Sequence, residues 1–480
     1  LGSTPRTKST DSEPARTEGP ANMKIIILGA GQVGTSMGEI LSREDNDVTL
    51  VDIDSEKLAG LQDRLDIRTV AGAASYPSVL ERAGVDDADL ILAVTDQDEV
   101  NMASCQIAHS LFNTPKKIAR IRSAEYLSHP GIFTDDAIPI DVIISPEHIV
   151  TQHILHLIDY PGALQVVSFA DDRIRLVGVR ANADSPLIGR ALKALREDLP
   201  NIDSRVAAIY RQAHAIVPDG DTVIEAGDEG FFLAAREDIQ AVMSELCAVG
   251  KPGRRIMLTG AGNIGLRLAE ALEQAHCHVK LVERDMARAK TVADQLEHTV
   301  VLHGDAADEE LMQQENIDNV DVFCSLTNDD EANILSAMLA KRLGAHRTMA
   351  LVNRSAYVDL MSNTLVDVAI SPKVATVGAL LTHVRRGDMV AVHSLRRGAA
   401  EAIELIAHGD ASSSKVVGKA VRDIGLPDGT SLGAILRGEE VVIAHGETVI
   451  EPEDHVILFV VDKGRIREVE QLFQVAVTFV

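Results

Sequence analysis

Short apolar runs of strand length alternate with longer amphipathic segments along the first third of the chain. From Met23 onward, the runs fall at 24–28, 48–52, 67–70, 90–94, 118–121 and 142–144, and helix-length segments separate most of them. Parallel strands need a connection of about this length between them. The alternation therefore predicts an α/β fold with a doubly wound parallel sheet.

The same series of motifs returns in the second half of the chain. Gly260 follows Gly29 by 231 positions, Thr327 follows Thr95 by 232, and an Arg-Ser-Ala triplet recurs at the same offset of 232. The offset then falls to 226, which places about six extra residues of the first copy in a loop. Ordered motifs with length changes confined to loops predict a tandem duplication.

Each predicted sheet domain is followed by a helix and then by short strands with Gly and Asp turns. The helices are expected near 148–159 and 373–386, and the strand regions share a Thr-Val-Ile-Glu motif at 222–225 and 448–451. Each strand region is small for an independent core, so we expect it to pack on a partner, for example the same module of another chain.

These features divide the chain into two nucleotide-type domains and two small α+β lobes. The predicted segments are a tag or disordered extension (1–22), a first nucleotide-binding domain (23–147), a helix and first lobe (148–250), a second nucleotide-binding domain (251–372), and a helix and second lobe (373–480).

Charge narrows the classes of partner. The 480 residues carry a formal net charge of −26, which argues against nucleic acid and against direct adsorption to an anionic membrane. No uncharged apolar stretch reaches the length of a membrane span, and residues 1–22 lack the apolar centre of a signal peptide. The four cysteines form no C-x-x-C pair and are expected to be reduced.

The chemistry-bearing motif is G-x-G-x-x-G directly after the first strand of each copy. A first glycine permits the tight turn, a second lets backbone amides approach a pyrophosphate, and a third lets helix and strand pack closely. The acids Asp52 and Glu283 end the next strand and would accept hydrogen bonds from an adenosine ribose. The predicted turn residues are Gly29, Ala30, Gly31, Gln32, Val33 and Gly34 in the first copy, and Gly260, Ala261, Gly262, Asn263, Ile264 and Gly265 in the second.

Further candidates lie at the carboxyl ends of later strands, where ligands of open parallel sheets bind. Two alternatives stay open for these residues. Asp96, Glu99 and their counterparts either cap the following helix or contact ligand, and Asp305 either caps a helix or orients a ribose or a loop. Arg120 lies on an apolar strand and needs a phosphate or a carboxylate. The candidates are Thr95, Asp96, Arg120, Arg122, Asp305, Thr327 and Arg354.

The ribose acids favour an unmodified 2′-hydroxyl, because a 2′-phosphate beside a carboxylate is repelled. NAD, ATP and ADP therefore fit better than NADP, although Arg284 weakens that exclusion in the second copy. The copies also differ at Asp305, where the first copy has Ala73.

The sequence predicts neither a metal site nor a catalytic centre. The histidine pairs at 153 and 156 and at 276 and 278 lack the further ligands that a metal site needs, so no metal is expected. No nucleophile elbow or Walker A loop is present, and no catalytic residue is predicted. An NAD-dependent dehydrogenase stays the alternative; it would need an acid–base group and a larger substrate domain. A nucleotide-sensing repressor would need a basic helix-turn-helix.

Taken together, these motifs closely resemble the TrkA family, the cytosolic subunits of Trk potassium uptake systems with tandem regulator-of-potassium-conductance (RCK) domains. The resemblance runs from Met23 to Val480 and rests on both motif copies and their order. It implies a homotetrameric, peripheral cytoplasmic subunit that binds NAD(H) and ATP or ADP and gates a TrkH-type potassium channel of the inner membrane. It further implies that the helices after each sheet domain cross over between domains. Carried over by residue, it implies ligand contacts from Gly29–Val33, Asp52, Thr95, Asp96 and Arg120, and from Gly260–Ile264 and Glu283.

Overall fold

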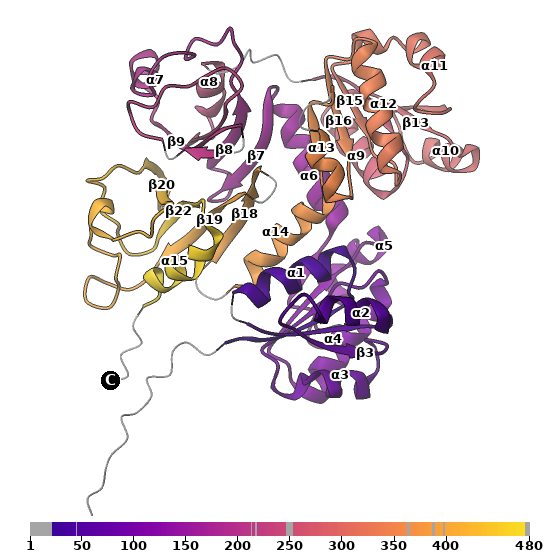
Figure 1. Cartoon of the computed structure of the whole chain (residues 1–480). Coiled ribbons are helices and arrows are strands. Elements are labelled where there is room, and N and C mark those ends of the chain that lie inside the picture. Colours follow the sequence, from indigo (N-terminus) through magenta and orange to yellow (C-terminus); the bar gives the residue numbers. More distant parts are fainter. Residues whose placement is uncertain are drawn as a thin grey trace, which may run out of the picture.

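The computed structural model consists of two three-layered α/β domains and two antiparallel lobes (Figure 1). It describes residues 22–44, 46–212, 214–216, 218–245, 253–361, 365–385, 389–396 and 399–475. The predicted extension, apart from residue 22, and Cys247 lie outside these ranges. Among the described residues, no helix is both long and apolar enough to cross a membrane.

The first domain is a parallel sheet of order β3-β2-β1-β4-β5-β6 with helices on both faces. The order reverses between β1 and β4, and this switch point is where doubly wound sheets bind ligands. Its elements are β1 (Lys24–Leu28), α1 (Gln32–Arg43), β2 (Asp47–Asp52), α2 (Ser55–Gln62), β3 (Arg68–Ala71), α3 (Pro77–Ala83), β4 (Leu90–Ala93), α4 (Asp98–Phe112), β5 (Lys116–Arg120), α5 (Ala124–Leu127) and β6 (Val142–Ile144).

The second domain repeats this topology, with sheet order β14-β13-β12-β15-β16-β17. The predicted fold class and duplication are confirmed. Its elements are β12 (Arg255–Thr259), α9 (Asn263–Gln274), β13 (His278–Glu283), α10 (Met286–Ala293), β14 (Val300–His303), α11 (Glu309–Gln314), β15 (Val322–Ser325), α12 (Asp330–Arg342), β16 (Arg347–Leu351), α13 (Ser355–Leu360) and β17 (Val368–Ile370).

Each lobe contains a five-stranded antiparallel sheet, in the orders β10-β9-β11-β8-β7 and β18-β19-β22-β20-β21. Each lobe contains a buried aspartate that forms an ion pair with an arginine, and the two pairs are equivalent. Arg211 binds Asp228 in the first lobe and Arg437 binds Asp454 in the second, each at 2.8 Å. The elements are β7 (Ala163–Phe169), β8 (Ile174–Arg180), α7 (Lys193–Asp198), β9 (Ser204–Arg211), β10 (His214–Ile216), β11 (Glu229–Ala235), α8 (Ile239–Ser244), β18 (Met389–Leu395), β19 (Ala400–Ala407), β20 (Thr430–Arg437), β21 (Glu440–Ile443), β22 (Asp454–Val460) and α15 (Ile466–Phe473).

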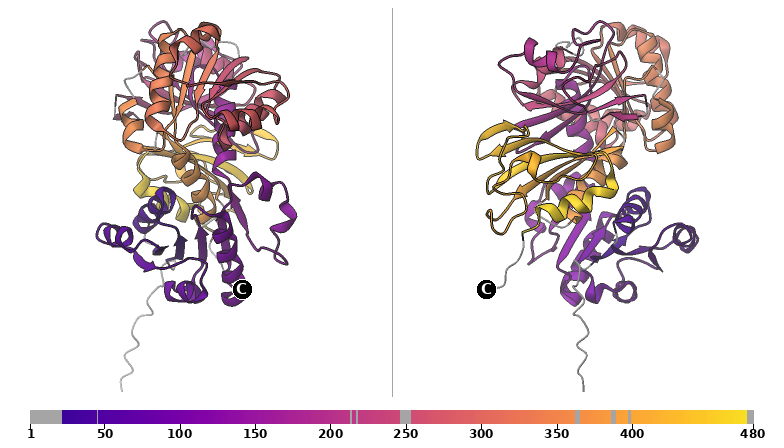
Figure 2. Two further views of the ribbon diagram at one scale, coloured as in Figure 1. Left: turned by 90° about the vertical axis from the view of Figure 1, so that its right-hand side faces the viewer. Right: turned by 60° about the vertical axis from the view of Figure 1, so that its left-hand side comes forward.

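The helices between sheet domain and lobe cross over, as the resemblance implied. Helix α6 (Pro146–Asp159) packs on α9 of the second domain, and α14 (Pro372–Val384) packs on α1 of the first. One hydrophobic core therefore joins the first domain, α14 and the second lobe, while another joins the second domain, α6 and the first lobe. Figures 1 and 2 show the two helices running through the middle of the molecule. Each half of the chain completes the core of the other.

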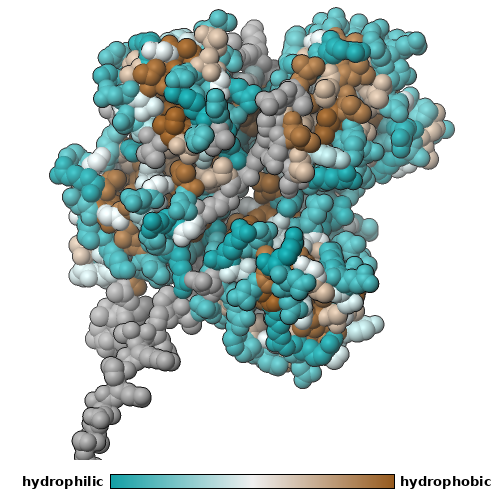
Figure 3. Space-filling view, viewed as in Figure 1, coloured by the Kyte–Doolittle hydropathy of each residue, from teal (hydrophilic) through white to brown (hydrophobic). Residues whose placement is uncertain are grey.

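The two lobes pack against one another through a shared apolar cluster. Polar contacts bridge the same interface. The side-chain amide of Gln165 donates to the Ser394 carbonyl at 2.7 Å, and the backbone amide of Ala170 donates to the Glu404 carboxylate at 3.0 Å. The partner expected for each small lobe is therefore the other lobe of the same chain. On the outside, hydrophilic residues cover most of the face in Figure 3, and apolar residues form scattered patches.

Candidate nucleotide-binding clefts

The glycine turns have the geometry that a pyrophosphate needs. Gly29 and Gly260 adopt φ of +102° and +92°, a region that favours glycine. A Cβ at Gly34 would lie 1.9 Å from the Gly29 carbonyl oxygen, so this position must be glycine for helix and strand to pack. A Cβ at Gly31, by contrast, would meet no atom within 4 Å. Nothing in the fold requires Gly31, but the absence of a side chain leaves the helix N-terminus open.

The acid at the end of the second strand is tied to the glycine turn. Asp52 accepts hydrogen bonds from the amides of Ala30 at 2.6 Å and Asp54 at 3.0 Å. Glu283 repeats this with Ala261 and Asp285, both at 2.8 Å. A carboxylate has about four acceptor positions, so each acid retains capacity for ribose hydroxyls.

The position after the acid differs between the copies. Ile53, the residue after Asp52, is an apolar side chain that is 79% exposed. The second cleft has the exposed Arg284 at this position, with Arg288 reaching over the turn to the Ala261 carbonyl at 2.8 Å. The second cleft is therefore more cationic beside Glu283 than the first is beside Asp52.

The hydroxyls of Thr95 and Thr327 are held by a buried asparagine. Each hydroxyl donates to the side-chain oxygen of an asparagine at 2.7 Å, which is Asn101 in the first copy and Asn333 in the second. The asparagine amide also donates to the carbonyl of the last residue of the neighbouring strand, Arg120 or Leu351, at 2.9 Å. This clasp joins two strand ends and a helix start, and it fixes the rim of each cleft.

A buried aspartate in the next turn binds the adjacent loop. Asp98 accepts from the amides of Arg122 and Ser123 at 2.8–3.1 Å. Asp330 does the same for Asn353 and Arg354 at 2.9 Å. Sequence reasoning missed both aspartates and both asparagines as individual functional residues, although they recur at the same place in the repeated segment.

Neither Asp96 nor its counterpart Asn328 is the N-cap of the following helix. The N-cap of α4 is Gln97, whose side chain makes no capping bond, so the capping interpretation of Asp96 is wrong. In α12 the N-cap is Asp329, the counterpart of Gln97, and it accepts from the Ala332 amide at 2.9 Å. Glu99 and Glu331 lie in the first turn of their helices, where the capping alternative placed an acid. The capping alternative for Asp305 is also wrong: its carboxylate binds the Ala307 amide within a turn, and Asp308 caps α11.

The Arg-Ser-Ala triplets do not superpose, which corrects the repeat read from the sequence. Ser123 in the first copy occupies the structural position of Arg354 in the second. The backbone amide of each donates to the buried aspartate, the carbonyl of each accepts from the amide four residues later, and each lies one residue before a helix, α5 or α13. The same offset of 231 pairs the two tyrosines that bind Glu99 and Glu331. The extra loop in the first copy is therefore five residues long at this register.

Arg120, the last residue of β5, is a basic side chain of the first cleft with a buried, unpaired donor. Its Nε is buried and has no hydrogen-bond partner among the described residues. Burial and the neighbouring Arg122 lower the pKa of Arg120. Arg122 itself is bound to the buried Glu147 at 2.7 Å. The structural counterpart of Arg120 is Leu351, so the second cleft lacks this cation.

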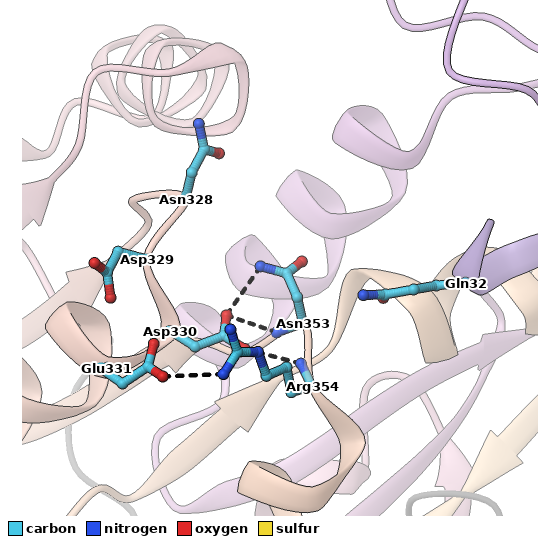
Figure 4. Close-up of a pocket in the computed structure, with 7 residues that line it drawn as sticks. All are labelled: Gln32, Asn328, Asp329, Asp330, Glu331, Asn353 and Arg354. Carbon is cyan, nitrogen blue, oxygen red and sulfur yellow. Dashed lines mark hydrogen bonds and ion pairs between the residues drawn. The ribbon is translucent and has the colours of Figure 1, made fainter.

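A polar cavity of about 270 Å³ lies between the first glycine turn and the second domain (Figure 4). The first domain contributes Gln32 from the start of α1, and the second domain contributes the segments that follow β15 and β16. Arg354 is bound here by Glu331 at 3.0 Å and by the Tyr357 hydroxyl at 2.9 Å. The lining residues are Gln32, Asn328, Asp329, Asp330, Glu331, Asn353 and Arg354.

Comparison with known proteins identifies the family. The TrkA-N domain model matches residues 25–146 and 256–372, and the TrkA-C domain model matches 176–246 and 410–474. The chain is 59% identical over 457 residues to the Trk system potassium uptake protein TrkA of Halomonas elongata, covering 95% of this chain and 100% of that protein. It is 50% identical over 459 residues to the TrkA of Haemophilus influenzae, covering 95% and 100%. The chain belongs to the TrkA family.

Solved structures agree with the fold of this TrkA-family chain. The crystal structure of the GsuK RCK domain matches with a TM-score of 0.59 at 18% identity, covering 97% of this chain and 98% of that one. The GsuK channel matches with a TM-score of 0.60 at 18% identity, covering 96% and 80%. The family belongs to a potassium uptake system and is not an enzyme family. The dehydrogenase alternative is thereby excluded.

Both TrkA-type clefts bring most of the predicted residues together. The glycine turns, the acids and the two threonines lie along the carboxyl edge of each sheet, and Arg120 ends β5 beside them. Asp305 lies in the turn after β14, and Arg354 faces the cavity. Among the described residues, no group of three or more His, Cys, Asp or Glu side chains is arranged to hold a metal ion.

Proposed function

We propose that this chain is a cytoplasmic regulatory subunit whose nucleotide occupancy gates a TrkH-type potassium channel. In this proposal NAD(H) and ATP or ADP are read and released unchanged, and four chains form a ring against the cytoplasmic side of the channel. The observation that carries it is the pair of open glycine turns, each tied to an acid at the next strand end. The GsuK channel, which shares the fold, has been solved bound to NAD, and this supports a dinucleotide ligand.

The geometry supports a specific set of ligand contacts for this proposal. The amides at the start of α1 and α9 would hold the pyrophosphate, and Asp52 and Glu283 would hold the adenosine ribose. Arg120 would bind a phosphate in the first cleft, because its buried Nε lacks a partner there. Thr95 and Thr327 would line the far half of each cleft, with Asp96, Arg122, Asp305 and Arg354 at the rim.

Helix α1 and a buried ion triad connect the first cleft to the second lobe. Helix α1 starts at the glycine turn and ends beside Glu44, whose carboxylate binds Arg385 at 2.5 Å. Arg385 follows α14 and also binds the buried Glu401 of β19 at 2.6 Å. The second domain has Ala275 at the end of α9 in place of Glu44. Movement of α1 on ligand binding would therefore reach the second lobe through Arg385.

The magnitudes allow such a ligand to control a channel. A ligand shifts a two-state equilibrium only by its difference in affinity for the two states. A tenfold preference is worth about 1.4 kcal/mol per site, so four equivalent sites in a ring supply roughly 5.5 kcal/mol, which inverts a 1:99 equilibrium.

The test combines binding and transport. Calorimetry of NADH, NAD, ATP and ADP should give binding to the wild type, and Asp52→Ala should weaken it by about tenfold or more at one of two sites. Glu283→Ala should weaken the other site. Potassium flux through a reconstituted complex should respond to the nucleotides and lose part of that response in Asp52→Ala. Flux that is indifferent to all four nucleotides would remove the proposal.

A further inference from the structure

The cavity described above joins the first glycine turn to the second domain. Gln32 is the first residue of α1, it is exposed, and it points toward Asn353 and Arg354 in Figure 4. The remaining lining residues follow β15 and β16, and the second glycine turn is not among them. The wall opposite the first turn is therefore supplied by the other copy of the fold.

The charge on this wall is acidic despite the arginine. Glu331 neutralises Arg354, and Asp330 binds backbone amides of the same loop. Asp329, at the N-cap of α12, adds a further carboxylate. The other polar groups are uncharged amides, from Gln32, Asn328 and Asn353. Such a wall suits a neutral or cationic group that forms hydrogen bonds, and it repels an additional phosphate.

A dinucleotide on the first turn would extend toward this wall. Its pyrophosphate lies at the N-terminus of the helix after β1, its adenosine lies toward β2, and its other half continues past the switch point. In this chain the N-terminus is that of α1, where Gln32 borders the cavity.

We propose that the second domain sets the ligand selectivity of the first cleft. The nicotinamide-riboside half of a dinucleotide enters the cavity, and the acidic wall around Arg354 disfavours the terminal phosphate of ATP. Arg120 attracts phosphates within the first cleft, so the opposite wall supplies the discrimination between the two nucleotides. The inference rests on the nucleotide binding proposed above.

The test uses Glu331→Gln in the full-length chain, with NADH and ATP titrated by calorimetry. Removing this carboxylate releases Arg354 and lowers the negative charge, so the dissociation constant for ATP should fall relative to that for NADH by about tenfold. The matched control is Glu309→Gln. Glu309 is an exposed acid of the same domain bound to Arg342, and its substitution changes net charge equally outside the cavity. The ratio should stay within about twofold of wild type in the control.

A double-mutant cycle with Gln32→Ala assigns the effect to the first cleft, since Gln32 belongs only to that turn. Coupling between the Gln32 and Glu331 substitutions in the ATP-to-NADH ratio supports the proposal. Additive effects overturn it, because Glu331 then acts on a ligand of its own domain. An unchanged ratio in Glu331→Gln also overturns it while the proposed nucleotide binding survives. A wild type that binds neither nucleotide would remove both.

Discussion

At the scale of single residues, the three glycines of each turn have separable roles. Gly29 and Gly260 supply a backbone conformation, and Gly34 and Gly265 supply space against the turn carbonyl. Gly31 and Gly262 border open space, so only an approaching ligand would require them to be glycine. The motif predicted these separate roles, and the structure confirms the two that concern folding, those of the first and third glycines.

We therefore expect Gly31→Ala to fold normally and to bind nucleotide poorly. The added methyl meets no protein atom, so the free energy of unfolding should change by less than about 1 kcal/mol. Nucleotide affinity at the first site should drop by about tenfold or more, measured by calorimetry. Gly34→Ala is the comparison, because its Cβ would overlap the Gly29 carbonyl oxygen. This substitution should lower the free energy of unfolding by about 2–4 kcal/mol, measured by thermal or urea unfolding. Equal nucleotide affinity in Gly31→Ala and wild type would contradict the assignment.

A second residue-scale prediction concerns Glu470 of α15. Burial, with Glu44 and Glu401 nearby, raises the pKa of Glu470 to about 7, although Arg385 and Arg467 act in the opposite direction. Because the pKa is raised in the folded state, the Glu470 carboxyl contributes stability that is fully present at pH values below its unfolded-state pKa. That contribution is lost as the pH rises through the folded-state pKa of about 7. Glu470→Gln should therefore gain stability over wild type between pH 5 and 8, by roughly 1–3 kcal/mol in urea unfolding. A difference that does not vary with pH would refute the shift.

The sequence predicted the residues that line the clefts better than those that hold the rim. Asp52, Glu283 and the glycines follow directly from spacing, because their positions are fixed by strand ends. The clasp by Asn101 and Asn333 depends on contacts between neighbouring strands, which no single motif encodes. The Arg-Ser-Ala triplets illustrate the opposite error: identical letters at a constant offset lie one residue apart in the structure.

At the scale of elements, the first cleft and the second lobe are joined by α1, Glu44 and Arg385. The ion pairs are short, and the side chains of Arg385 and Glu401 are 2% exposed. Buried charges of this kind add little net stability but lose much when a partner is removed. The predicted strands and crossover helices were found within a few residues of their expected ends, whereas this ion triad joins three distant segments and has no local signature.

We expect Glu44→Gln to uncouple the lobe from the cleft. Nucleotide affinity should stay within about threefold of wild type, because the glycine turn is untouched. The nucleotide-induced change in hydrogen exchange of α14 and β19 should fall by at least half. Glu39→Gln is the control: it lies on the same helix, its pair with Arg43 is exposed, and it removes the same charge. An unaltered exchange response in Glu44→Gln would show that α1 signals by another route.

At the scale of the whole molecule, the crossover helices make each half depend on the other. Apolar residues of α6 pack in a core with the second domain, and those of α14 pack in a core with the first. The apolar spacing of these helices was evident in the sequence. Which domain they cover, and the packing of the two lobes on one another, were decided by tertiary contacts between residues more than 100 positions apart.

The first half alone, residues 23–250, should therefore fail to form a stable monomer. Its helix α6 would expose the face that normally meets α9, and its lobe would lack the second lobe. We expect this fragment to dimerise or aggregate in light scattering, and to become a soluble 1:1 complex when expressed with residues 251–480. A monomeric, cooperatively unfolding first half would contradict the exchange of cores.

The asparagine clasp has one more consequence. Because Asn101 and Asn333 already fix the threonine and the adjoining strand ends, the entrance of each cleft is formed before a nucleotide arrives. Little conformational entropy then has to be lost locally on association. The free energy released by binding remains available to displace whole domains, and a gating subunit needs such a displacement.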